Sequence, residues 1–257
     1  MSELTLPLAL FNLFPVVLTG LALWFLARLV GALDPPHRTM ARAGGVLILL
    51  GGLSKAVWKL ILVAGGQDLT WLASMLFPLM APGFALLAGA ALGVLLRLQG
   101  RGEVALIRYG VAAVILVVVG AVVVRTLGMG IPRGWFLPLL GLTSVANLVL
   151  SLVLIASALR LGHTGAAILF GVNLAMVFAL PPIAMASPDT LFMHWSEQVL
   201  TAIGTAAFAL GGYWLWRSAR ASGCVRAVSG DAAAGSRDRG SSGSARVRRD
   251  GRRGLGR

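Results

Sequence analysis

Residues 51–60 read Gly-Gly-Leu-Ser-Lys-Ala-Val-Trp-Lys-Leu and lie inside an apolar run that covers about 43–64. Their two lysines, Lys55 and Lys59, are the only lysines in the chain. An apolar run of about 20 residues predicts a membrane-spanning helix, in which a cation near the bilayer midplane costs roughly 2.5–3.5 kcal/mol. Because the lysines are four residues apart, they share one helical face. We therefore treat them as candidate site residues.

The rest of the chain has the same apolar character. Hydrophobic residues make up 58% of it and charged residues 12%, with a mean hydropathy of +0.87. This composition excludes a soluble domain and predicts an all-α polytopic membrane protein. The first run is also too long for a signal-peptide core, so we expect a retained helix. Seven transmembrane helices are predicted, at 8–30, 43–64, 72–96, 105–125, 136–159, 163–184 and 192–216.

The arginines predict the orientation, because loops that stay in the cytoplasm are enriched in basic residues. One side of the predicted membrane has only Arg125 and Arg133. We therefore predict an N-out, C-in, multi-pass protein of the cell (inner) membrane. The arginine-rich side holds Arg28, Arg38, Arg42, Arg97, Arg101, Arg108, Arg160 and Arg217.

An internal repeat is possible. A shift of 124 residues aligns Trp71 with Trp195 and also superposes a Phe-Ala-Leu triplet, 84–86, on 208–210. A shift of 120 residues aligns further Gly, Ile and Leu residues of the second and sixth spans. These matches indicate a possible 3+1+3 parallel repeat with the fourth span as linker, a layout that places a ligand site between the halves.

The chain divides into a seven-helix membrane domain, 1–217, and an Arg/Gly/Ser-rich tail, 218–257. The tail has ten arginines and three aspartates and therefore contributes +7 of the net charge of +13. It lacks an apolar period, so we expect a disordered cytoplasmic segment. Contact with anionic lipid is a second possibility for it, and no specific nucleic-acid binding is expected. The single cysteine, Cys224, excludes an intrachain disulfide.

The two lysines are predicted to lie at different depths in the membrane. From the start of the 43–64 run, Lys55 lies roughly 18 Å along the helix and Lys59 roughly 24 Å. Lys55 is thus expected to face the bundle interior, and Lys59 to reach the outer headgroups or a partner. The expected partner is Glu197, about one turn below the outer surface and level with Lys59. The group is either a solute site, with Trp58 between the lysines, or a structural ion pair.

Two amides fall near mid-membrane, Asn147 in the fifth span and Asn173 in the sixth. Interhelical hydrogen bonds, worth about 0.6 kcal/mol each on average, are one explanation. Lining of a polar cavity is the other, and both residues are candidate ligand contacts. Asn12, in the first span, is a weaker candidate.

The residue patterns that metal binding and hydrolysis require are absent from the sequence. The chain has no HExxH or other metal-binding spacing. Glu197 is the only acidic residue inside a predicted helix, which leaves no second acid for hydrolysis. We expect no enzymatic activity, cofactor or metal. The favoured function is a carrier or binder of a small polar or anionic solute, and the alternative is a non-transport scaffold or sensor subunit that partners another membrane protein.

Overall fold

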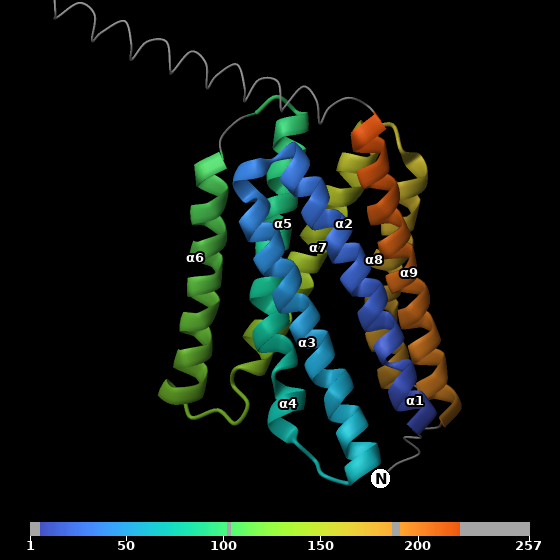
Figure 1. The fold of residues 1–257 in the computed structure, drawn as a ribbon. Helices are drawn as coiled ribbons and strands as arrows, with labels where there is room; N and C mark the ends of the chain where they lie inside the picture. The colour runs from blue at the N-terminus through green and yellow to red at the C-terminus, as the bar shows by residue number, and fades with distance from the viewer. Residues whose placement is uncertain (1–5, 102–103, 187–190, 222–257) are drawn as a thin grey trace, which may run out of the picture.

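The computed structural model describes residues 6–101, 104–186 and 191–221, and these are helical with no strand among them (Figure 1). The predicted all-α class is confirmed. The elements are α1 (Leu6–Phe11), α2 (Leu13–Leu33), the 3-10 turn η1 (Pro35–His37), α3 (Arg38–Gly65), α4 (Thr70–Ser74), α5 (Leu76–Leu98), α6 (Val104–Val123), the π-helical turn η2 (Val124–Gly128), α7 (Phe136–Arg160), α8 (Thr164–Ala186) and α9 (Leu191–Ala221).

Six of these helical segments are long and apolar enough to cross a membrane, which indicates a multi-pass membrane protein. The predicted span at 163–184 coincides with α8, whose described apolar part, Thr164–Leu180, is shorter than the others. The count of seven therefore stays a prediction. The six segments are Leu6–Leu33, Pro35–Gly65, Thr70–Leu98, Ala105–Gly128, Phe136–Arg160 and Trp195–Ala221.

Proline interrupts two of the spans. Pro15 follows the end of α1 at Phe11 by four residues, and Pro78 follows the end of α4 at Ser74 by four residues. A proline lacks the backbone N–H that the carbonyl four residues earlier would accept, and its ring clashes with that carbonyl. Each span therefore breaks into a short helix and a long one. The first break places Asn12 between α1 and α2.

The long helices form a closed ring in which α2 packs on α3, α3 on α5, α5 on α7, α7 on α8, α8 on α9, and α9 on α2. The helix α6 lies outside this ring and packs on α5 and α7 (Figure 1). No residue in the most apolar 18-residue window of its span is buried. The ring, and not α6, therefore encloses the interior of the protein.

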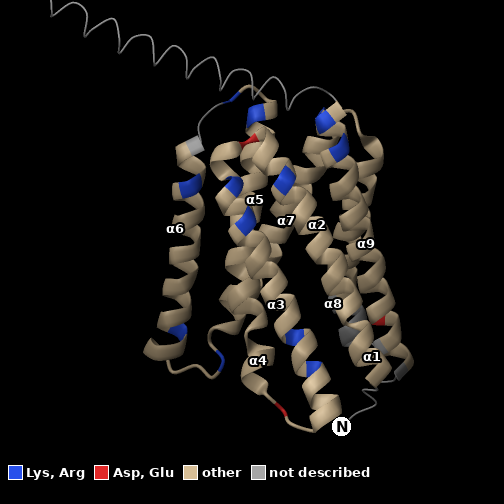
Figure 2. Ribbon diagram, viewed as in Figure 1, with Lys and Arg blue, Asp and Glu red and all other residues tan. Residues whose placement is uncertain are grey.

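Most of the basic residues that the structure describes lie at one end of the ring of helices (Figure 2). We call the end where α2 stops and α3 starts the arginine-rich end, because it carries Arg28, Arg38, Arg42, Arg97 and Arg220. Which side of the membrane this end faces stays a prediction. The last helix, α9, continues to Ala221, so it includes the first four residues of the predicted tail, 218–221.

The interior is closed toward the arginine-rich end. Leucines from three helices meet there, among them Leu26 of α2, Leu87 of α5, and Leu150 and Leu154 of α7. The void they leave is about 10 Å³, which is about the volume that one water molecule needs. We call these four residues the leucine seal.

Candidate functional site

The inward face of α3 changes from buried to exposed along its length. Ala41, Ile48 and Lys55 are spaced by seven residues, which keeps them on one face of the helix. Ala41 and Ile48 are buried, whereas Lys55 is exposed. The face that is closed near the arginine-rich end is therefore open where the first lysine lies.

The neighbours of two glycines show that this face points inward. A Cβ on Gly51 would lie 2.8 Å from Met80 of α5, and a Cβ on Gly52 would lie 3.7 Å from Val16 of α2. Lys55 follows these glycines by one turn, so it lies between the directions of α5 and α2. This placement agrees with the expectation that Lys55 faces the bundle and not the lipid.

Lys59 binds Asn12. Its ammonium Nζ donates to Asn12 Oδ1 at 3.2 Å, while Asn12 Nδ2 donates to the Leu8 carbonyl at 2.9 Å. The expected close pair between Lys59 and Glu197 is not formed, since no lysine in the described part of the chain lies within 4.0 Å of that carboxylate. The amide at the break between α1 and α2 takes this place instead.

Glu197 nevertheless belongs to the same region. Its carboxylate attracts both ammonium groups, and the two ammonium groups repel each other. The neighbouring Trp195 ring lies 5.6 Å from Phe11, which brings the start of α9 beside α1. We call Lys55, Lys59, Asn12 and Glu197 the lysine cluster. It holds two cations and one anion, so an anion that enters it meets a net positive charge.

No protein family model matches the chain, and no curated protein or solved structure matches it either. The site is therefore defined by its residues and their surroundings alone.

The other predicted site residues, Trp58, Asn147 and Asn173, have no hydrogen bond to the lysine cluster within the ranges that the structure describes. Trp58 donates its indole N–H to Asp68 Oδ1 at 2.8 Å, across the turn between α3 and α4. Only its ring face is left for a ligand. Asn147 is buried on α7, one turn before Leu150 of the leucine seal. It therefore lies beside the leucine seal.

Asn173 is buried between α8 and α9, where a Cβ on Gly204 would lie 3.6 Å from its Oδ1. Gly204 is seven residues from Glu197, or about 10 Å along the helix. Among the described residues, no hydrogen bond is formed by the side chain of Asn147 or Asn173. Neither amide is among the fully buried polar atoms that lack a partner, so the amide atoms of both side chains stay accessible to water or a ligand.

Sequence reasoning missed an ion triad at the arginine-rich end. Asp34 and His37 are both 0% exposed, and their side chains meet with Nδ1 and Oδ2 at 2.5 Å. Arg97 of α5 brings its Nε to 2.8 Å from Asp34 Oδ1. No local sequence pattern indicates this contact, because Asp34 and Arg97 are 63 positions apart in the chain.

Gly93 makes room for the triad. A Cβ at this position would overlap the Asp34 carboxylate and lie 2.7 Å from His37 Nδ1. The triad therefore fastens the connection between α2 and α3 onto α5, beside the leucine seal. In the described ranges, no three His, Cys, Asp or Glu side chains are placed to hold a metal ion.

Proposed function

We propose that this protein is a carrier for a small anionic or polar solute and that Lys55 is the electrostatic anchor of its binding site. The observation that carries the proposal is the inward face of α3, which is buried at Ile48 and exposed at Lys55. In this proposal Lys59 and Glu197 line the entrance beside Trp58. Asn147 and Asn173 are the deeper polar contacts.

A cation inside a membrane protein needs water or a counter-charge. Lys55 has no carboxylate within 4.0 Å among the described residues, and it is exposed where Ile48, on the same face of α3, is buried. A bound carboxylate, phosphate or similar group satisfies that requirement. Lys59 adds positive charge on the same face, and Glu197 favours a solute that also has a cationic or hydroxyl group.

The leucine seal supports a carrier over a channel. The interior is closed at the leucine seal and Lys55 is exposed, so in this conformation the proposed access is from the side of the lysine cluster. Alternating access between two repeats around a midplane site is the usual mechanism of such folds. The arginine distribution supports an arginine-rich end in the cytoplasm and an opening to the outside of the cell (inner) membrane.

The packing order of the ring supports the 3+1+3 repeat. The halves α2–α3–α5 and α7–α8–α9 are each packed consecutively, and they meet through α2 with α9 and through α5 with α7. Exchange of the two halves leaves this set of contacts unchanged. The helix α6 joins them from outside the ring, where a linker between parallel repeats belongs.

A thermal-shift titration tests the anchor. Full-length protein in detergent is titrated with acetate, glutamate, sulfate and inorganic phosphate. An anion at 100 times its Kd stabilises the folded state by about 2.7 kcal/mol, which raises Tm by several degrees. Lys55→Met removes this rise, whereas Arg160→Met, the same change on an exposed cation at the other end, keeps it. A rise that persists in Lys55→Met contradicts the proposal.

Uptake of the stabilising anion into proteoliposomes then separates a carrier from a binding protein. The alternative function, a non-transport scaffold or sensor subunit, draws support from α6, which lies outside the ring and exposes apolar side chains such as Leu116 and Val117 on the surface that does not pack on α5 and α7. Under that alternative, Leu116→Arg on α6, at an exposed position, abolishes association with the partner, and Lys55→Met has no functional effect.

A further inference from the structure

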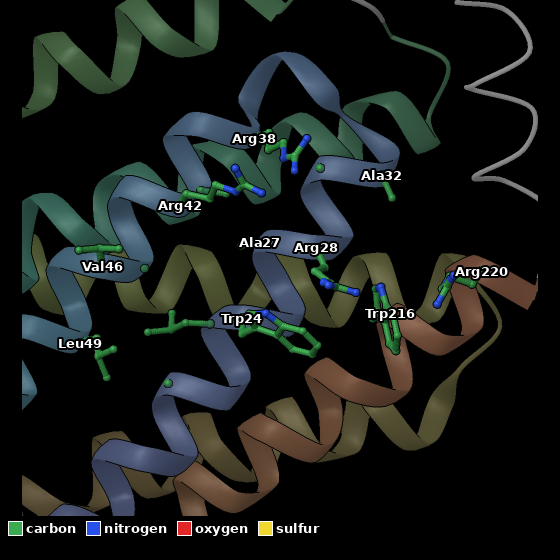
Figure 3. Close-up of a pocket in the computed structure, with 15 residues that line it drawn as sticks. Trp24, Ala27, Arg28, Ala32, Arg38, Arg42, Val46, Leu49, Trp216 and Arg220 are labelled. Carbon is green, nitrogen blue, oxygen red and sulfur yellow. The ribbon is translucent and has the colours of Figure 1, made fainter.

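The arginine-rich end also holds a groove of about 740 Å³ between α2, α3 and α9 (Figure 3). It is separate from the lysine cluster, and its interpretation does not depend on the proposed solute site. Four arginines from the three helices surround it. They are Arg28 of α2, Arg38 and Arg42 of α3, and Arg220 of α9.

The four guanidinium groups lack acidic partners. None of them forms an ion pair within the described ranges. Asp34, the described acid at this end, is fully buried and is already held by Arg97 and His37. The groove therefore presents a concentrated positive charge that needs an anionic partner.

Tryptophan rings fix two of the arginines. Arg28 lies over the ring of Trp24 at 4.4 Å, and Arg220 lies over the ring of Trp216 at 4.9 Å. Such cation–π contacts restrict the guanidinium groups, and tryptophan is typical of the depth where lipid headgroups meet hydrocarbon. The charged part of the groove thus lies at headgroup depth.

Away from the arginines, toward the middle of the helices, the groove is lined by apolar and small residues. Gly20, Gly45 and Leu49 line this part. From Gly31, near the arginines, to Gly20, the groove runs 11 residues of helix, or about 17 Å. This length is close to half the hydrocarbon thickness of a bilayer, about 15 Å.

The groove is open toward the surrounding membrane. Trp24 is 48% exposed and Val46 is 56% exposed, and both line it. A free phosphate ion would fill only the charged part and leave the apolar part uncovered. A phospholipid fills both, because its headgroup meets the arginines while an acyl chain covers the leucine and glycine surface.

From this geometry we infer that the groove between α2, α3 and α9 is a binding site for an anionic phospholipid of the leaflet at the arginine-rich end. The phosphate contacts Arg28 and Arg42, and an acyl chain lies along Gly20, Gly45 and Leu49. The site uses the membrane domain itself and differs from contact between lipid and the Arg-rich tail.

The test is native mass spectrometry of the full-length protein in detergent, titrated with phosphatidylglycerol or with phosphatidylcholine. One juxtamembrane charge is worth about fivefold in lipid affinity. Arg28→Gln with Arg42→Gln therefore weakens phosphatidylglycerol binding about 30-fold. Arg252→Gln with Arg253→Gln, an equal charge change in the tail, leaves it unchanged.

Val46→Trp is the second variant, and it fills the apolar part without any change in charge. We expect it also to weaken phosphatidylglycerol binding. If size-exclusion chromatography shows that the arginine variant is misfolded, Val46→Trp alone tests the proposal. Equal binding of the two lipids, an equal effect of the tail variant, or full affinity in Val46→Trp overturns the assignment. Displacement of phosphatidylglycerol by an equal concentration of inorganic phosphate also overturns it, and indicates a free-anion site.

Discussion

Neutralisation of Arg97 tests the ion triad that fastens the α2–α3 connection onto α5. Removal of one partner of a buried pair costs about 3–5 kcal/mol in soluble proteins, because the other charge is left unpaired. Arg97 is 31% exposed and partly screened, whereas Asp34 is 0% exposed. We therefore expect Arg97→Met to lower the free energy of unfolding by about 2–3 kcal/mol.

Asp34→Asn is the milder change, at about 1–2 kcal/mol, because the amide still accepts hydrogen bonds and the freed Arg97 can reach water. The double variant removes both the carboxylate and the guanidinium, so neither of these two charges is left without the other. Its loss is therefore smaller than the sum of the two single losses, by about 1.5 kcal/mol or more.

Equilibrium unfolding in mixed detergent and SDS micelles, followed by helical circular dichroism, measures these values. Arg101→Met is the matched control, because Arg101 is an exposed cation in the loop after α5 and is expected to change stability by less than about 0.5 kcal/mol. Additive single effects, or an Arg97→Met variant as stable as the wild type, would refute the reasoning.

Three further predictions follow from particular contacts. Gly93→Ala destabilises by about 1–3 kcal/mol through overpacking against the triad, whereas Gly110→Ala, which has nothing within 4 Å, is neutral in the same unfolding assay. A double-mutant cycle of Lys59→Met and Asn12→Ala gives a coupling near 0.6 kcal/mol, the average for hydrogen bonds between membrane helices; zero coupling would remove Asn12 from the lysine cluster. Truncation after Ala221, where α9 ends, leaves Tm within a degree or two; a large loss would show that the tail packs on the helices.

The membrane helices could be predicted from the sequence because apolar length acts locally. Runs of about 20 apolar residues locate each helix, and the structure agrees with the predicted bounds to within about five residues. Pro15 and Pro78 each follow a break by about one turn of chain, whereas Pro82 lies inside α5 without ending it, so the breaks could not be predicted from proline alone. The prediction that the Lys55 side chain points toward the bundle is also local, because a cation avoids lipid.

Contacts between distant segments could not be predicted in this way. The triad depends on the approach of α5 to the turn after α2, which no local pattern of Asp34 or Arg97 encodes. The arginines of the groove were interpreted singly as a signal of orientation, and their convergence with Trp24 needs the packing of three helices. The choice of Asn12 over Glu197 as the partner of Lys59 depends on the packing of α1 beside α3, where the Asn12 amide is held by the Leu8 carbonyl.

Thiol accessibility along α3 tests the central claim, that the inward face opens at Lys55. In a Cys224→Ser background, which removes the only native thiol, Lys55→Cys and Ile48→Cys are treated with a membrane-impermeant maleimide in intact cells. The account predicts that the Lys55→Cys variant is labelled from outside and that the Ile48→Cys variant, two turns nearer the leucine seal, is protected. Equal labelling of the two variants, or protection of Lys55→Cys from a water-soluble reagent, would contradict it.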